Sequence, residues 1–184
     1  MTTMARRWAG RAVTCPCRRW LIVLAAVLSL LVSTGAPAVA RDTGSDTGLA
    51  IPRFVSLRAD TVNMRAGPGL RYPIEWVFKR QGLPVVVLEE FNAWRKVRAA
   101  DGTQGWVHAA MLAGKRTARV VGGSMRALLA EPADTAATIA LVEPGAIGTL
   151  GDCTGDYCEV DLGAHSGWLK RSDMFGVRQG PDGN

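Results

Sequence analysis

Short apolar runs rich in β-branched residues alternate with turn residues along the chain from Phe54 onward. In the first half these runs are about five or six residues long, and Gly, Pro, Asn or Asp interrupts them every 8–12 residues. The strand candidates are residues 54–59, 62–65, 74–79, 84–90, 94–99 and 104–108. Residues 67–73 read as a long loop, and residues 99–103 (Ala-Ala-Asp-Gly-Thr) read as a hairpin turn. No long segment there has a helical period, so the pattern predicts a small all-β barrel or sandwich.

The second half repeats the plan of the first at a spacing of 62–64 residues. Trp94-Arg-Lys-Val97 corresponds to Tyr157-Cys-Glu-Val160, and Gly105-Trp106-Val107 corresponds to Gly167-Trp168-Leu169. This spacing predicts a tandem duplication of a unit of about 60 residues, that is, two small barrels. By propensity, residues 134–143 could instead form a helix capped by Asp134, whereas the repeat predicts a loop followed by a strand.

Residues 1–40 have the three parts of an export signal. Five arginines come first, then the uncharged run 21–32, then the small-residue stretch 33–40. Ala38 and Ala40 fit the small-residue positions that a signal peptidase accepts, so we predict a signal peptide cleaved after Ala40. The alternative is an uncut anchor, although an apolar core of about 12 residues is shorter than the roughly 20 of a spanning helix. Both interpretations put the rest of the chain in the periplasm or outside the cell, because the arginines stay on the inner side.

Most of the net charge of +6 comes from the predicted signal peptide. Without the five arginines of residues 1–40, the chain has 17 basic and 16 acidic residues, which excludes a general nucleic-acid binder. The two halves differ, since residues 55–120 hold 11 basic and 5 acidic residues and residues 121–184 hold 4 and 9. The opposite net charges of the two halves could hold the barrels together or present two faces to different partners. They could also be ordinary solvated surface.

The cysteines agree with an oxidising compartment. Cys15 and Cys17 lie before the apolar core and leave with the signal, so that Cys153 and Cys158 remain. They bracket Thr-Gly-Asp-Tyr, a candidate hairpin turn, and we predict a structural disulfide between them. The alternatives are two free thiols, or half of a metal site with His165 that lacks enough ligands for zinc. We therefore expect no metal and no cofactor.

Several of these landmarks resemble the bacterial Src-homology-3-like (SH3-like) domains of exported cell-envelope proteins. The resemblance rests on Val62-Asn-Met-Arg-Ala-Gly-Pro-Gly69, Tyr72-Pro73, Trp94-Arg-Lys-Val97 and Asp101-Gly-Thr-Gln-Gly-Trp-Val-His108. The second copy is weaker, with Ala127-Leu-Leu-Ala-Glu-Pro132 in place of the first motif, but it keeps Gly167-Trp168-Leu169 and Met174-Phe-Gly-Val177. The resemblance implies an all-β chain of two tandem five-stranded SH3-like barrels that bind peptides or peptidoglycan without catalysis.

The expected organisation follows from the signal, the repeat and the resemblance together. Its parts are a signal peptide (1–40), a flexible lead-in (41–52), a first barrel (53–116), a second and divergent barrel (118–179) and a tail (180–184).

We find no catalytic constellation in the sequence. The only histidines, His108 and His165, have no Cys or Ser at a catalytic spacing, and the two remaining cysteines are expected to be oxidised. The candidate ligand-binding residues are Tyr72, Trp94 and Arg65, although Arg65 could instead brace the loop of its motif. Trp106 and Trp168 are expected in or near the core. Trp76 is expected in the interior, because it alternates with Ile74 and Phe78.

The leading functional hypothesis is an exported, non-catalytic module that binds peptidoglycan, a cell-wall peptide or an envelope protein. It binds no nucleic acid and meets the membrane only through an uncleaved signal peptide. The alternatives are an adaptor or inhibitor that acts on an envelope enzyme or secretion system, and a cell-wall hydrolase.

Overall fold

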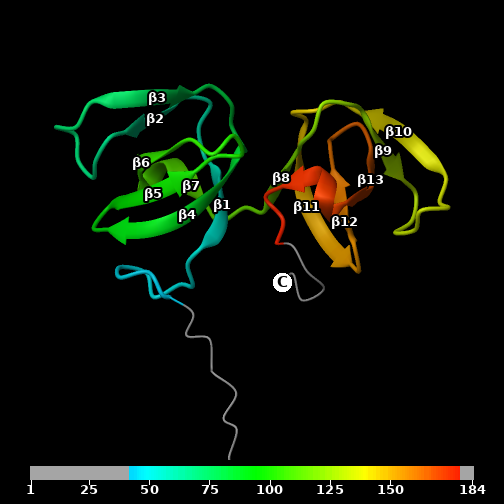
Figure 1. Ribbon diagram of the computed structural model, residues 1–184, viewed down its shortest axis with the longest axis horizontal. Coiled ribbons are helices and arrows are strands. Elements are labelled where there is room, and N and C mark those ends of the chain that lie inside the picture. Colours follow the sequence, from blue (N-terminus) through cyan, green and yellow to red (C-terminus); the bar gives the residue numbers. More distant parts are fainter. Residues whose placement is uncertain (1–41, 179–184) are drawn as a thin grey trace, which may run out of the picture. The chain divides into compact units, whose positions relative to one another are not determined.

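A computed structural model describes residues 42–178 (Figure 1). The predicted signal peptide, its cleavage site and the predicted tail lie outside the described residues. Within residues 42–178, no helix combines the length and hydrophobicity needed to cross a membrane.

Two antiparallel sheets contain all the named strands. The first sheet comprises β1 (Arg53–Leu57), β2 (Val62–Arg65), β3 (Ile74–Phe78), β4 (Pro84–Phe91), β5 (Trp94–Arg98), β6 (Gln104–His108) and β7 (Leu112–Ala113). The second comprises β8 (Thr117–Val120), β9 (Arg126–Leu129), β10 (Thr138–Val142), β11 (Ile147–Thr154), β12 (Tyr157–Asp161), β13 (Ser166–Lys170) and β14 (Met174–Phe175). A 3-10 turn precedes the last strand of each sheet, η1 (Ala109–Met111) and η2 (Arg171–Asp173).

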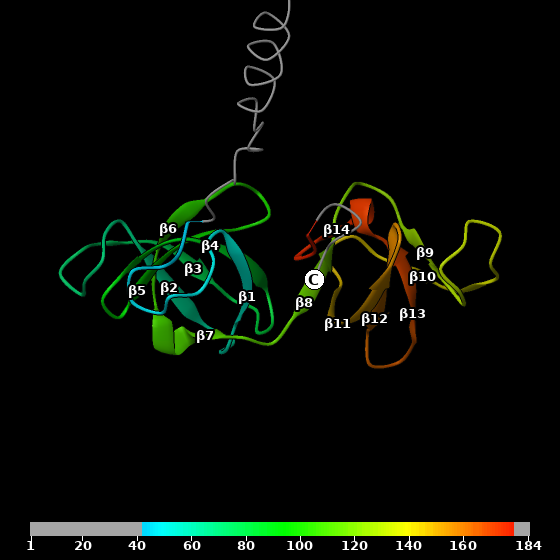
Figure 2. The ribbon, with the colours of Figure 1, turned by 90° about the horizontal axis from the view of Figure 1, so that it is seen from below.

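The two sheets have the same topology. The first has the order β3-β2-β6-β5-β4-β1-β7, and the second has β10-β9-β13-β12-β11-β8-β14. Figure 2 shows the run β11, β12 and β13 in the second sheet, where consecutive strands pair antiparallel. Since the two orders match strand for strand, the predicted duplication and the all-β class are confirmed.

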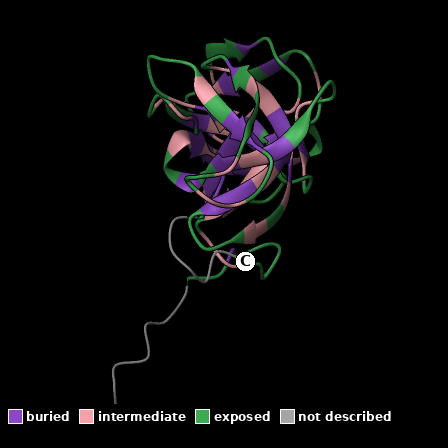
Figure 3. Ribbon diagram, turned by 90° about the vertical axis from the view of Figure 1, so that its right-hand side faces the viewer, coloured by how far each residue is buried: buried purple, intermediate pink, exposed green. Residues whose placement is uncertain are grey.

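Each sheet curls around its own hydrophobic core. The first core contains ten buried side chains. Four of them have no exposed surface, namely Val85, Val87, Val97 and Val107. The second is built around Leu128, Cys158, Val160 and Leu169. In Figure 3 the buried residues concentrate on the strands and the exposed ones on the loops. β4 begins with four consecutive buried residues, Pro84–Val87, whereas buried residues alternate with half-buried or exposed ones in β5. Both environments suit β-branched side chains in strands.

The local turn predictions are confirmed. The turn at 99–103 joins β5 to β6, with Ala99 N–H donating to the Thr103 carbonyl at 2.9 Å and Gly102 at a φ of 88°. The turn between Cys153 and Cys158 joins β11 to β12 and has Gly155 at a φ of 54°. Residues 138–142 form β10, so the helix alternative for residues 134–143 is wrong.

Two expectations differ from the structure. The resemblance implied five strands per barrel, but each sheet has seven, because the long loop after β1 itself contains the hairpin β2–β3. The prediction that Trp76 is interior is wrong, since it is 47% exposed while Phe78 is buried. A bulge leaves Glu75 as an extra residue between Ile74 and Trp76, but Trp76 and Phe78 keep their alternation opposite Met64 and Val62. The exposure of Trp76 follows instead from the position of β3 at the sheet edge, where only Phe78 of this strand reaches the core.

Candidate functional site

Side chains along β5 and β6 alternate between the core and the outer face of the first sheet. Val97 and Val107 are in the core, so the residues one position away face outward. We call this outer surface the aromatic face. Its residues on these two strands are half-buried or exposed, namely Trp94, Lys96, Trp106 and His108.

One row of the aromatic face consists of three rings. Trp94 pairs in register with His108 on one side and with Phe91 on the other. The rings of Trp94 and His108 meet edge to face, with centroids 5.3 Å apart, and Phe91 is 52% exposed. The Nδ1 atom of His108 accepts a hydrogen bond from Ala110 N–H at 3.2 Å, which fixes the imidazole at the start of η1. The row is thus held in place before any ligand arrives.

A second row places two cations beside an indole. Trp106 pairs with Arg65 on β2 and with Lys96 on β5. Lys96 Nζ is 2.7 Å from Glu89 Oε1, an exposed ion pair on the same sheet. Arg65 Nη1 donates to the carbonyls of Tyr72 at 2.7 Å and Leu70 at 3.2 Å. Arg65 therefore supports the loop 66–73, the bracing role that the sequence left open.

Tyr72 lies in that loop and is half-buried. Its ring packs on Gly67, where an added Cβ would lie 2.6 Å from the ring carbons. The Arg71 guanidinium lies over the ring at 5.0 Å and donates to the Tyr72 hydroxyl at 3.2 Å, which raises the pKa of Arg71. Tyr72 is thus tied to the aromatic face through its own carbonyl and Arg65.

The structure gives the positions of the three residues predicted to bind ligand. Arg65 and Trp94 both lie on the aromatic face, and Tyr72 is joined to it through the hydrogen bond to Arg65. Sequence reasoning missed Trp106, which was expected near the core but is half-buried on the outer face. The signal was present in the sequence, because Trp106 directly precedes the core residue Val107 on a strand.

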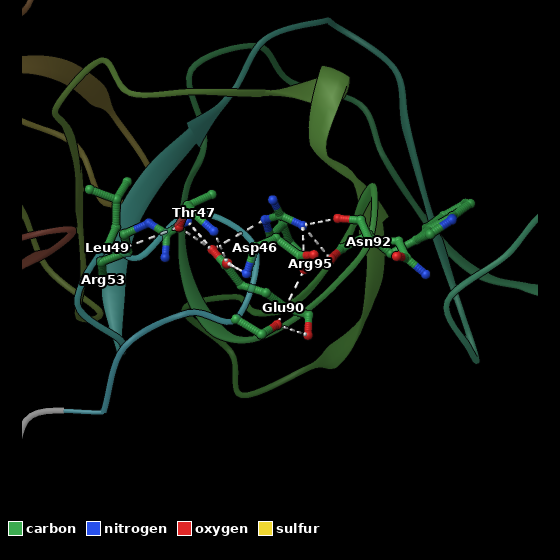
Figure 4. Close-up of polar contacts among 9 residues, drawn as sticks. Asp46, Thr47, Leu49, Arg53, Glu90, Asn92 and Arg95 are labelled. Atoms are coloured by element: carbon green, nitrogen blue, oxygen red, sulfur yellow. Dashed lines mark hydrogen bonds and ion pairs between the residues drawn. The ribbon is translucent and has the colours of Figure 1, made fainter.

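A buried ion cluster joins β1, β4 and β5 of the first barrel (Figure 4). The Glu90 side chain has no exposed surface. Its Oε1 atom lies 2.6 Å from Arg53 Nη2 and 3.3 Å from Arg95 Nε. Arg95 also donates to the carbonyls of Asn92 at 2.6 Å and Trp94 at 2.8 Å.

Residues 42–50, expected within a flexible lead-in, form a short turn that covers this cluster. We call this segment the N-terminal turn; a bridge between Thr43 and Ala50 closes it. The Glu90 Oε2 atom accepts from the backbone N–H groups of Asp46 at 3.0 Å and Thr47 at 2.9 Å, and the Thr47 hydroxyl donates to Oε1 at 2.8 Å. A Cβ at Gly44 would overlap the carboxylate. The N-terminal turn is thus held by Glu90, a residue more than forty positions away in the chain.

These contacts set the ionisation of Glu90. Burial raises the pKa of this carboxyl, but the hydrogen bonds from Arg53, Thr47 and Asp46 outweigh that effect and lower it to about 2. Glu90 is therefore charged throughout the neutral and mildly acidic range.

The second barrel has a disulfide where the first has this ion pair. Glu90 pairs in register with Arg95, and the corresponding pair in the second sheet is Cys153 with Cys158. Their sulfurs are bonded, with Cα atoms 4.0 Å apart, as the sequence predicted. The equivalent hairpins of the two barrels thus use an ionic and a covalent link at the same position.

Within residues 42–178, no cluster of three or more His, Cys, Asp or Glu side chains is arranged to hold a metal ion. The candidate site is instead a surface of rings and cations on one sheet face.

The chain is similar to several known proteins. Among solved structures, NlpC2 and NlpC1 from Trichomonas vaginalis are each 14% identical to this chain, with TM-scores of 0.31 and 0.32 over 67% and 72% of it. An NlpC/P60 family protein from Bacillus cereus ATCC 10987 is 13% identical, with a TM-score of 0.31 over 66%. The chain spans 48%, 48% and 55% of these three structures, about half their length. No curated protein matches it.

The family model described as the bacterial SH3 domain matches residues 58–114 and 122–176, one match in each sheet. These matches cover more than half of the sequence, and the chain therefore belongs to the bacterial SH3 domain family.

Proposed function

We propose that this protein is an exported, non-catalytic binding module of the cell envelope that holds peptidoglycan peptides on the aromatic face of its first barrel. Bacterial SH3 domains are typically cell-wall binding modules, which supports a binding role. The observation that carries the proposal is the ordered row of Phe91, Trp94 and His108 beside the Arg65–Trp106–Lys96 row.

The chemistry of the face suits an extended ligand that carries carboxylates. Flat rings on a rigid sheet stack against a peptide or sugar with little loss of side-chain freedom. Residues 55–120 hold 11 basic and 5 acidic side chains, so their field attracts an anionic stem peptide. Arg65 and Lys96 supply the nearest cations on the face itself.

A binding role fits the state of the groups that a cell-wall peptidase would need. Cys153 and Cys158 are joined in a disulfide, so neither offers a thiolate. His108 holds the start of η1 through Nδ1 and contacts Trp94.

Co-sedimentation of the purified protein with isolated sacculi tests the proposal. We expect the wild type to be retained at low salt. Trp94→Ala should bind the sacculi about tenfold or more weakly, since removal of an aromatic anchor from a binding site typically costs about 2 kcal/mol. Trp76→Ala is the matched control, because Trp76 is an exposed tryptophan of the same barrel outside the face. Equal losses in both variants, or no retention of the wild type, would contradict the proposal.

A second candidate is an adaptor or inhibitor of an envelope enzyme or secretion system. It is favoured by the exposed apolar side chains of the hairpin β2–β3 and its loop, where Leu70 is 78%, Ile74 45% and Trp76 47% exposed. Cross-linking in an envelope fraction distinguishes the two candidates. If the protein is an adaptor, cross-linking recovers one partner protein in stoichiometric amount, and Trp76→Ala reduces this recovery. If it is a cell-wall binder, no such partner protein is recovered.

A further inference from the structure

The second barrel already holds a carboxylate at the position equivalent to the first barrel's aromatic row. Trp94 and His108 correspond to Tyr157 and Lys170, which pair in register in the same way. One oxygen, Asp134 Oδ1, accepts from the Tyr157 hydroxyl at 2.6 Å and lies 2.5 Å from Lys170 Nζ. The Lys170 ammonium is also 5.8 Å from the centre of the Tyr157 ring. Two donors thus converge on a single carboxylate oxygen.

Asp134 comes from the loop 130–137 between β9 and β10, which corresponds to the loop 66–73 of the first barrel. The residue at the matching position of the first loop is Leu70, whose side chain is 78% exposed. The duplication therefore provides an internal comparison. In the first barrel this loop position holds an exposed leucine, and in the second it places an acid on the equivalent pair of residues.

We infer that Tyr157 and Lys170 form a carboxylate-binding site, which Asp134 fills in the free protein and which a ligand carboxylate takes over by displacing it. Tyr157 is only 7% exposed, so its hydroxyl is fixed in direction and suits recognition. The Asp134 side chain is 75% exposed, so water competes for the same contacts and the occupant exchanges easily. A charge-assisted pair of donors on one oxygen is the arrangement that a terminal carboxylate requires.

The exchange needs no unfolding of the loop. Its backbone closes on itself, with Ala130 N–H donating to the Ala137 carbonyl at 2.9 Å and Ala136 N–H donating to the Ala133 carbonyl at 3.1 Å. These bonds are independent of the Asp134 side chain. Rotation of that one side chain therefore opens the site.

The charges of the site persist at neutral pH. The hydrogen bond from Lys170 lowers the pKa of the Asp134 carboxyl, with Tyr157 adding to the effect, and the same bond raises the pKa of Lys170. Residues 121–184 hold 4 basic and 9 acidic side chains, so the surroundings repel an anion. A carboxylate ligand therefore depends on the two local donors, which makes the inference sensitive to single substitutions.

The inference is tested by nuclear magnetic resonance titration of the full protein. The probes are N-acetyl-alanyl-alanine, its C-terminal amide and N-acetylmuramic acid, so that a peptide carboxylate and a sugar-acid carboxylate are distinguished. We expect Asp134→Ala to bind a carboxylate probe about fivefold more tightly than the wild type, because the site no longer has a competing occupant. The amide should cause no shifts at Tyr157 or Lys170.

Matched variants make the result specific. Glu131→Ala removes the same charge from the same loop and should bind like the wild type. Adding Lys170→Met to Asp134→Ala should abolish the gain, and adding Tyr157→Phe should reduce it. The inference is overturned if folded Asp134→Ala shows no shifts with either carboxylate probe. Equal tightening in Glu131→Ala, which would indicate a general charge effect, also overturns it. Retention on sacculi through Trp94 is measured separately, so the two proposals fail independently.

Discussion

Replacement of Glu90 by Gln is expected to destabilise the first barrel strongly. The change keeps the shape of the side chain but removes the charge that holds Arg53 at 2.6 Å and Arg95 at 3.3 Å. It also weakens the bonds that Glu90 accepts from Asp46 and Thr47 in the N-terminal turn. Two arginines would then share a largely buried space in which Asp46 Oδ2, 3.9 Å from Arg95 Nη1, is the remaining acidic partner.

The size of the effect follows from two routes. Removing one partner of a buried ion pair generally costs about 3–5 kcal/mol. Independently, lowering the Glu90 pKa from 4.5 to about 2 corresponds to about 3 kcal/mol of folded-state stabilisation. The side chains of Arg53 and Arg95 keep 16% and 9% of their surface exposed, so we reduce that figure for solvent screening to about 2 kcal/mol. We therefore expect Glu90→Gln to lower the free energy of unfolding by about 2–3 kcal/mol at neutral pH.

The sign of the pH dependence is fixed by the direction of the shift. A carboxyl whose pKa is lower in the folded than in the unfolded state stabilises the fold above the unfolded value of 4.5. This stabilisation is lost as the pH falls from 4.5 toward 2. The difference between the wild type and Glu90→Gln should therefore be full at pH 7 and shrink progressively below pH 5.

Urea unfolding followed by tryptophan fluorescence measures the effect. A Trp168→Phe background leaves Trp76, Trp94 and Trp106 as reporters of the first barrel among the described residues. Glu89→Gln is the control, because its carboxylate is 54% exposed and pairs only with Lys96, so we expect a change of at most about 1 kcal/mol. Equal effects of Glu89→Gln and Glu90→Gln, or a Glu90→Gln penalty that does not change with pH, would refute the reasoning.

Two further predictions concern single links in the barrels. Reduction of the Cys153–Cys158 disulfide should lower the stability of the second barrel by about 2 kcal/mol in the chain-entropy model and leave amide exchange of the first barrel unchanged; an unchanged second barrel would contradict this. Gly67→Ala should cost about 1–3 kcal/mol and displace the Tyr72 ring, whereas Gly114→Ala, which has open space around its Cβ, should be neutral in the same urea assay.

Local pattern carried much of the fold. Period-two runs and the turn at 99–103 are properties of short stretches of sequence. The repeat is visible because similar short motifs recur at a spacing of 62–64 residues. The structure confirms them as strands, as a hairpin and as two sheets of one topology. The disulfide was predictable for the same reason, since Cys153 and Cys158 bracket one short turn.

The candidate site was only partly predictable. Placing Arg65 beside Trp106 required the pairing of β2 with β6, strands that lie about forty residues apart in sequence. The sequence named Arg65 and Trp94 through a family resemblance, but their common face follows from strand register.

The strands, the turns and the duplication of the unit can be read from the sequence, because alternation and turn chemistry act between near neighbours. Three features depend on how the sheets fold: the exposure of Trp76 on an edge strand, the contact of Glu90 with the N-terminal turn, and the contact of Asp134 with Tyr157. The exposure of Trp76 follows from the place of β3 at the edge of its sheet, which the local pattern does not give. The other two contacts join residues 44 and 23 positions apart, and such pairings depend on how the whole sheet curls.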